Sequence, residues 1–145
     1  MKKTKMLILF IVFVIIFISV GWWYTMMINT NFATEALLEF HYQAVPGGHN
    51  PDANISVVIT DENDILALQE ILRGRSVRSS FDCGFSIDIS ITMTNGRRSI
   101  MFCPANDGCP TLRIGNSNRY LTVSDEAIAI LHEILEKYGA FFPCI

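Results

Sequence analysis

The sequence predicts an α+β protein in which an N-terminal transmembrane helix precedes an antiparallel sheet with two helices on one face. Residues 6–28 contain no charged side chain. Several later segments alternate apolar and polar residues, which is typical of half-buried strands. Segments 61–72 and 124–135 instead repeat apolar residues at helical spacing. The order after residue 36 is therefore β-β-α-β-β-β-β-α, and one sheet face buries both helical stripes.

We expect Met6–Ile28 to be a transmembrane signal-anchor helix. At about 1.5 Å per residue it would reach across the roughly 30 Å hydrocarbon core. Trp22 and Trp23 stand near its end, where aromatic rings favour the headgroup level. Lysines among residues 1–5 favour a cytoplasmic N-terminus, which places the C-terminal domain outside a cell membrane. A cleaved signal peptide is the alternative, but the bulky apolar core offers only poor cleavage sites.

The rest of the chain divides into a spacer at residues 29–36 and one extracytoplasmic domain at 37–145. All 14 Asp and Glu residues follow the apolar segment, whereas three of the 11 Lys and Arg residues precede it. The domain is therefore acidic, which argues against nucleic acid as a partner. Predicted partners are the lipid bilayer, through Met6–Ile28, and another surface protein or a wall polymer.

The first half of the domain predicts a hairpin followed by a helix. Leu38–Val45 alternates and Asn54–Thr60 is rich in β-branched residues, with a loop dense in Pro and Gly between them. The helix at 61–72 begins at Asp61, whose carboxylate can cap the first turn. Gly74 is expected to end it.

The second half predicts two hairpins and a final helix. Strand Cys83–Met93 alternates strictly, and Asn95–Gly96 is a strong signal for a two-residue turn into strand Arg97–Cys103. A shorter hairpin follows at Thr111–Ile114 and Arg119–Val123. Ser124 is expected to cap the last helix. The apolar tail at 140–145 is expected to dock on the core.

The four cysteines, Cys83, Cys103, Cys109 and Cys144, predict two disulfides if the domain lies outside the cytoplasm. Metal ligation is the rival interpretation, but it usually shows C-x2-C pairs, which this chain lacks. We therefore predict no metal site and no cofactor. Free or redox-active thiols are a third possibility.

The strand register separates the possible pairings. A two-residue turn at Asn95–Gly96 places Cys103 opposite Asp88, on the sheet face that Cys83 does not share and too far from it to bond. Two connectivities then stay open. The preferred one joins Cys103 to Cys109 and Cys83 to Cys144. The alternative joins Cys83 to Cys109 and Cys103 to Cys144.

The chain has no G-x-S-x-G, H-E-x-x-H or phosphate-loop motif, so its sequence contains no recognisable catalytic constellation. Five arginines form the only basic concentration and could contact an anionic partner. They are Arg73, Arg75, Arg78, Arg97 and Arg98.

Three segments, CGFSIDISI, DGCP and KYGAFFPCI, resemble those of small extracytoplasmic domains of Gram-positive, clostridial-type bacteria. The resemblance covers about residues 54–145 and implies no activity. The leading prediction is a membrane-anchored extracytoplasmic binding or sensing module without catalytic activity. The alternatives are a thiol-redox or cysteine enzyme at the cell surface, and an immunity or inhibitor protein against a surface-acting toxin.

Overall fold

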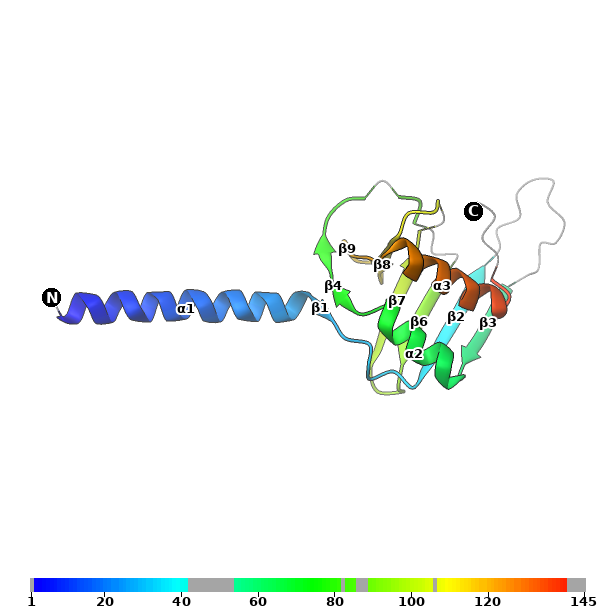
Figure 1. The fold of residues 1–145 in the computed structure, drawn as a ribbon, viewed down its shortest axis with the longest axis horizontal. Coiled ribbons are helices and arrows are strands. Elements are labelled where there is room, and N and C mark those ends of the chain that lie inside the picture. The colour runs from blue at the N-terminus through cyan, green and yellow to red at the C-terminus, as the bar shows by residue number, and fades with distance from the viewer. Residues whose placement is uncertain (1, 42–53, 82, 86–88, 106, 141–145) are drawn as a thin grey trace.

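The computed structural model describes residues 2–41, 54–81, 83–85, 89–105 and 107–140, and it has an α+β fold (Figure 1). The described helices are α1 (Lys2–Met26), α2 (Glu62–Ile71) and α3 (Asp125–Lys137). The described strands are β1 (Met27–Ile28), β2 (Glu35–His41), β3 (Asn54–Ile59), β4 (Gly74–Arg75), β5 (Val77–Arg78), β6 (Ile89–Thr94), β7 (Ser99–Pro104), β8 (Thr111–Ile114) and β9 (Arg119–Thr122).

The main sheet is antiparallel throughout and has the strand order β3-β2-β6-β7-β8-β9-β5. A second, two-stranded sheet joins β1 to β4. The predicted order contained neither β1, β4 nor β5, each of which is two residues long. A strand of two residues places one side chain on each face, which is too few to show the alternation by which strands are predicted.

The first hairpin is confirmed by the pairing of β2 with β3, in which Leu38 lies opposite Val57. Strand β2 begins at Glu35, inside the predicted spacer. The predicted strand residues 42–45 lie outside the described part of the chain. Glu35 pairs with Thr94 of β6, so contact with a central strand extends β2 towards the N-terminus.

Both predicted helix caps are present. The Asp61 carboxylate accepts hydrogen bonds from the backbone N–H groups of Asn63 (3.0 Å) and Asp64 (3.1 Å). The Ser124 hydroxyl accepts one from the N–H of Ala127 (3.2 Å). These bonds satisfy N–H groups that have no partner inside the helix. The start of each helix is therefore fixed by its own sequence.

The core lies between the sheet and the two helices α2 and α3, which cover one sheet face (Figure 1). Its fully buried side chains come from both layers and include Leu38, Ile91, Phe102, Leu68 and Leu131. Burying a side chain of this size contributes about 1.5–3 kcal/mol each. The predicted stacking of both helices on one face is therefore what holds the domain together.

The connection between β6 and β7 is longer than predicted. Thr94 pairs with Ser99 rather than facing Arg97, so residues 95–98 form the turn. The Asn95 side chain accepts hydrogen bonds from the N–H groups of Arg97 (3.1 Å) and Arg98 (2.9 Å), which stabilises the longer loop. The register shifts by two residues, and an even shift leaves every side chain on its predicted face.

The transmembrane anchor predicted at residues 6–28 is contradicted by the structure. In the part of the chain that is described, no helix has the length and apolar character needed to cross a membrane. Helix α1 ends at Met26, and the next two residues form β1. The predicted single-pass localisation in a cell membrane is corrected accordingly.

Helix α1 is joined to the domain by a set of polar contacts where it ends. The backbone N–H and the hydroxyl of Ser76 both donate to the carbonyl oxygen of Met26, at 2.8 and 2.9 Å. Arg119 donates to the Ser76 hydroxyl (2.7 Å) and to the carbonyl oxygen of Thr25 (3.2 Å). The Arg75 guanidinium lies 4.5 Å from the centre of a Trp23 ring. The helix therefore projects from a fixed point of the domain (Figure 1).

Candidate functional site

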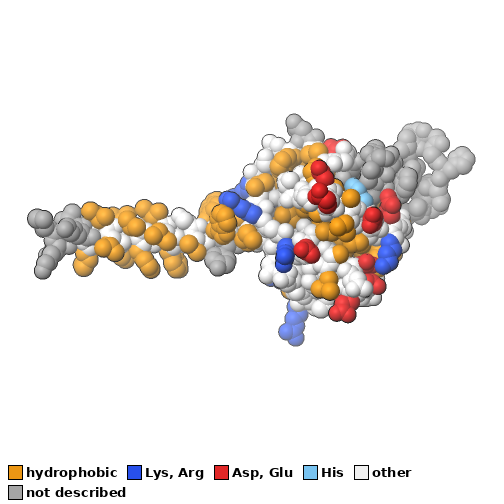
Figure 2. Space-filling view, viewed as in Figure 1, with side chains coloured by type: hydrophobic (Ala, Val, Ile, Leu, Met, Phe, Trp, Pro, Cys, Tyr) orange, Lys and Arg blue, Asp and Glu red, His pale blue; other side chains and the backbone are white. Residues whose placement is uncertain are grey.

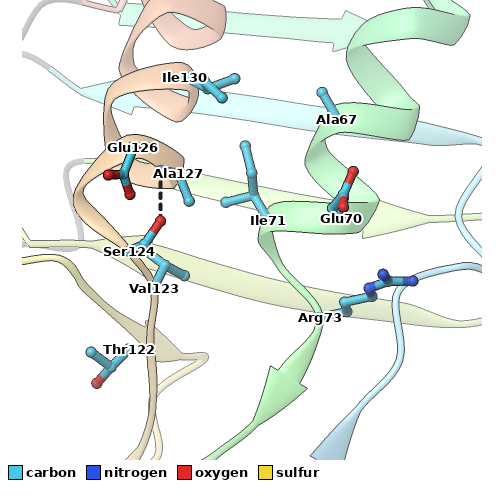
Figure 3. Close-up of a pocket in the computed structure, with 10 residues that line it drawn as sticks. All are labelled: Ala67, Glu70, Ile71, Arg73, Thr122, Val123, Ser124, Glu126, Ala127 and Ile130. Carbon is cyan, nitrogen blue, oxygen red and sulfur yellow. Dashed lines mark hydrogen bonds between the residues drawn. The ribbon is translucent and has the colours of Figure 1, made fainter.

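A groove with a volume of about 420 Å³ lies between α2 and α3 (Figure 3). Its apolar lining comes from the facing sides of the two helices and from the residue before the α3 cap. These residues are Ala67, Ile71, Val123, Ala127 and Ile130. Small alanines on both helices leave the space open, because their side chains do not fill the gap between the backbones. We call this site the helix groove.

Charged side chains border the helix groove. Glu70 and Arg73 come from the end of α2 and the residues after it, and Glu126 comes from the first turn of α3 (Figure 3). Hydrogen bonds from its own backbone N–H and from the Ser124 hydroxyl lower the pKa of Glu126 below its ordinary value. Glu126 is therefore ionised at neutral pH, and the border of the groove carries both signs of charge.

The helical face around the groove is strongly acidic. Helix α2 contains three acidic residues and α3 contains four, whereas Lys137 is the only Lys or Arg in either helix. Figure 2 shows acidic side chains spread over the face on which these helices lie. An excess of acidic side chains around an apolar groove favours positively charged ligands.

Apolar surface continues outside the helix groove. Ile130 lines the groove and is 46% exposed, and Leu66 on the neighbouring turn of α2 is 55% exposed. A second hollow of about 340 Å³ lies beside Leu66 and shares Glu70 and Arg73 with the first. The two hollows therefore meet at these charged residues.

The five predicted anion-contact arginines are distributed over different elements. Arg73 lines the helix groove, and Arg78 lies in edge strand β5. Arg75 stacks on Trp23, and Arg98 lies 4.3 Å from the centre of the Phe32 ring. Arg97 belongs to the β6–β7 turn. Arg73 is the member of the set that reaches the groove.

The structure bonds Cys83 to Cys109, across a sequence separation of 26 residues. This bond belongs to the alternative connectivity, and it replaces the preferred bond between Cys103 and Cys109. Cys103 is buried and is bonded to no other cysteine in the described part of the chain. Cys144 lies outside that part.

Polar bonds hold the two cysteine segments together. Phe85 pairs with Ala105, which brings the segment before β6 beside the β7–β8 connection. The Asp107 carboxylate accepts hydrogen bonds from the N–H of Gly84 (2.6 Å) and of Cys109 (3.2 Å). These bonds lower the pKa of Asp107, the Gly84 bond most. We call Cys83, Asp107 and Cys109 the sulfur cluster.

Sequence reasoning missed a buried guanidinium on the sheet face opposite the helices. Arg113 pairs with Cys103 on one side and with Tyr120 on the other. Its Nε and Nη2 atoms are buried and have no hydrogen-bond partner within the described residues. The Phe85 ring lies 5.9 Å from the guanidinium carbon and packs on Tyr120. The alternation of β8 predicts which sheet face Arg113 occupies. The Phe85 ring that packs on its guanidinium belongs to a segment distant in sequence, so this contact could not be predicted.

Comparison with known proteins adds no relative: the chain matches no protein-family model, no curated protein and no solved structure. The resemblance to Gram-positive extracytoplasmic domains therefore stays a prediction, and any function must be argued from the sites themselves.

Proposed function

We propose that the domain is a non-catalytic binding module whose helix groove receives an apolar, positively charged segment of a partner protein. The observation that carries this proposal is an open apolar groove set in an acidic helical face. The occupant has one or two apolar side chains that enter the groove and Lys or Arg residues on either side of them.

The size of the helix groove suits such an occupant. Its volume of about 420 Å³ lies in the range of roughly 300–1,000 Å³ that is usual for ligand sites. Ile130 already stands 46% exposed at its edge. A partner side chain seated against Ile130 and Ala127 removes apolar surface from water, which supplies the free energy of binding.

The charges select the partner. Glu70 and Glu126 border the groove, and the helices that form it carry seven acidic residues against one basic residue. Basic side chains on the partner would be attracted at long range and would pair at the rim, which raises the association rate and disfavours acidic segments. Arg73 adds one cation, which would repel a Lys or Arg placed at that end of the groove.

The lining supports binding rather than catalysis. No histidine or cysteine is found among its described residues. The Ser124 hydroxyl is held by the α3 cap, where it accepts a hydrogen bond from the N–H of Ala127. A nucleophilic serine needs an adjacent general base, and the carboxylate beside Ser124, that of Glu126, has a lowered pKa, which makes it a weak base.

The test measures fluorescence anisotropy of three labelled peptides added to the full-length chain. One peptide alternates Leu and Lys, the second alternates Leu and Glu, and the third alternates Ser and Lys. We expect the Leu–Lys peptide to bind at least 10-fold tighter than the other two. Equal affinity for the Leu–Glu peptide, or no saturable binding of the Leu–Lys peptide, would overturn the proposal.

Two substitutions locate the binding. Ile130→Glu places a charge at the edge of the groove and should weaken binding at least 10-fold. Val58→Glu is the matched control, because Val58 is a similarly exposed apolar residue (53%) on edge strand β3. Circular dichroism checks that both variants fold. Equal losses in the two variants would place the binding outside the groove.

A further inference from the structure

We propose that Cys83, Asp107 and Cys109 form a thiol-switched site for a thiophilic divalent cation, with Zn²⁺ the best fit. The site is closed while the two cysteines are joined as a disulfide and opens when that bond is reduced. This inference is independent of the helix groove and of the function proposed for it.

The three donor atoms already lie close to one another. One ligand atom from each of the three residues lies within 4.8 Å of the other two. Zn–S bonds of about 2.3 Å and Zn–O bonds of about 2.0 Å at tetrahedral angles place ligand atoms roughly 3.5–3.8 Å apart. Reduction frees the two sulfurs to separate to this distance, and the carboxylate needs only a small inward movement.

The chain holds the carboxylate in a form that suits a metal. Its two oxygens accept hydrogen bonds from the Gly84 and Cys109 N–H groups, and each oxygen keeps a lone pair. Hydrogen bonds that orient a ligand in this way are a usual feature of metal sites.

The backbone makes a tight turn at Gly108, inside the cluster. Gly108 has φ +79°, a conformation that side-chain-bearing residues rarely adopt, and no atom lies where its Cβ would be. The turn lets Asp107 and Cys109 present a carboxylate and a thiol two positions apart. The Cys109 carbonyl accepts a hydrogen bond from the Thr111 N–H at 2.7 Å, which fixes the end of the turn at β8.

Accessibility distinguishes this pair of cysteines from the third. Cys83 and Cys109 are half-buried and Asp107 is exposed, so reductant and cation can reach them. Cys103 is 1% exposed and is not part of the cluster. Three protein ligands leave the fourth tetrahedral position for water.

The switch is a balanced two-electron exchange. A small dithiol reductant attacks the disulfide, the S–S bond breaks, and the two cysteines take up two protons and two electrons as thiols. The reductant leaves as its own disulfide. Cation binding then displaces the two thiol protons, since thiolate is the metal ligand. Two thiolates and one carboxylate around Zn²⁺ leave a net charge of about −1.

The experiment uses the full-length chain in two states, oxidised and reduced with dithiothreitol under argon, with the reductant then removed. Zn²⁺ is titrated against a chromophoric chelator, and Co²⁺ is used to detect a thiolate-to-metal charge-transfer band. We expect one Zn²⁺ per reduced chain and none for the oxidised chain. Equal uptake in both states would overturn the proposal, because the ligands would then lie elsewhere.

Variants assign the ligands. Cys83→Ser and Cys109→Ser should each weaken Zn²⁺ binding at least 100-fold, and Asp107→Asn at least 10-fold. Cys103→Ser is the matched control and should bind within 3-fold of the wild type. Loss of binding in Cys103→Ser, or unchanged binding in Cys83→Ser, would refute the assignment.

A second measurement does not depend on affinity. Bound Zn²⁺ should protect Cys83 and Cys109 from alkylation by N-ethylmaleimide, as mapped by mass spectrometry of the digested chain. Unprotected Cys83 and Cys109 in the presence of saturating Zn²⁺ would contradict the proposed ligation.

Discussion

At the scale of single residues, Asp64 connects the start of α2 to the end of α3. One of its oxygens accepts hydrogen bonds from the Tyr138 hydroxyl and from the Lys137 ammonium, both at 2.7 Å. The bonds from Lys137 and Tyr138 hold the pKa of Asp64 below its usual value of 3.8. The sequence predicts neither bond, since the partners stand more than 70 positions apart.

The substitution Asp64→Asn should lower the free energy of unfolding by about 1 kcal/mol at neutral pH. The Tyr138 bond to a charged acceptor provides most of this, because Lys137 is 54% exposed and exposed ion pairs contribute little. Urea unfolding measures the change. Glu62→Gln is the control, since it removes the same charge from the same helix turn. An equal loss in both variants would mean that the helix dipole, rather than the link to α3, is responsible.

The lowered pKa of Asp64 also predicts that the stability of the domain depends on pH. A carboxyl group whose folded-state pKa is lowered stabilises the fold above its unfolded-state pKa, and this stabilisation is lost as the pH falls through the folded-state value. The wild type should therefore lose more stability than Asp64→Asn between about pH 5 and pH 2. Parallel curves for the two proteins would show that Asp64 is not linked to folding.

At the scale of elements, the disulfide joins the segment before β6 to the connection between β7 and β8. Closing a loop of this length in the unfolded chain corresponds to roughly 3–4 kcal/mol of stabilisation. The observed register keeps Cys103 on its predicted face. The Phe85 ring packs against Tyr120 and Arg113 on that same face, so the alternation predicted for Cys83–Met93 does not continue back to Phe85. The choice between Cys103 and Cys83 as the partner of Cys109 depends on the pairing of Phe85 with Ala105, which no local pattern encodes.

Digestion of the oxidised chain without reductant should yield one peptide pair containing Cys83 and Cys109. Reduction should lower the melting temperature of the wild type and leave a Cys83→Ser/Cys109→Ser double variant unchanged. A recovered peptide that joins Cys103 to Cys109 would contradict this pairing. A drop of equal size in the double variant would assign the effect of reductant to another bond.

At the scale of the whole molecule, the orientation of α1 is set by residues distant in sequence. Ser76 and Arg119 bind the carbonyl groups of the last turn of α1, and β1 pairs with β4 directly after it. Ser76 is 1% exposed, so water does not compete for its hydrogen bonds. These contacts attach the end of α1 to the domain.

Arg119→Ala should therefore loosen this junction without unfolding the domain. The Ser76 amide, which donates to Met26, should exchange its hydrogen at least 10-fold faster in the variant. Hydrogen-exchange mass spectrometry measures the rate. Arg78→Ala is the matched control, because Arg78 pairs with Arg119 in the sheet but is exposed. Unchanged exchange in Arg119→Ala would show that β1–β4 pairing alone holds α1.

Patterns of neighbouring residues are sufficient to predict most of the local structure of this protein. The α+β class, the starts of α2 and α3, and the presence of three hairpins depend on residues a few positions apart, so periodicity and capping suffice to predict them. The sequence also predicted which face each β6 and β7 side chain occupies, because an error of two residues preserves the face.

Contacts between segments that are distant in sequence could not be predicted and are seen only in the folded chain. The helix groove requires two helices about 60 residues apart, and the sulfur cluster requires the pairing of Phe85 with Ala105, which no repeat or motif signals. The two-residue strands that hold α1 are likewise too short to be recognised alone. Burial of the shared apolar core fixes how the helices pack on the sheet. The loops are then placed by the elements that they connect, rather than by their own residues.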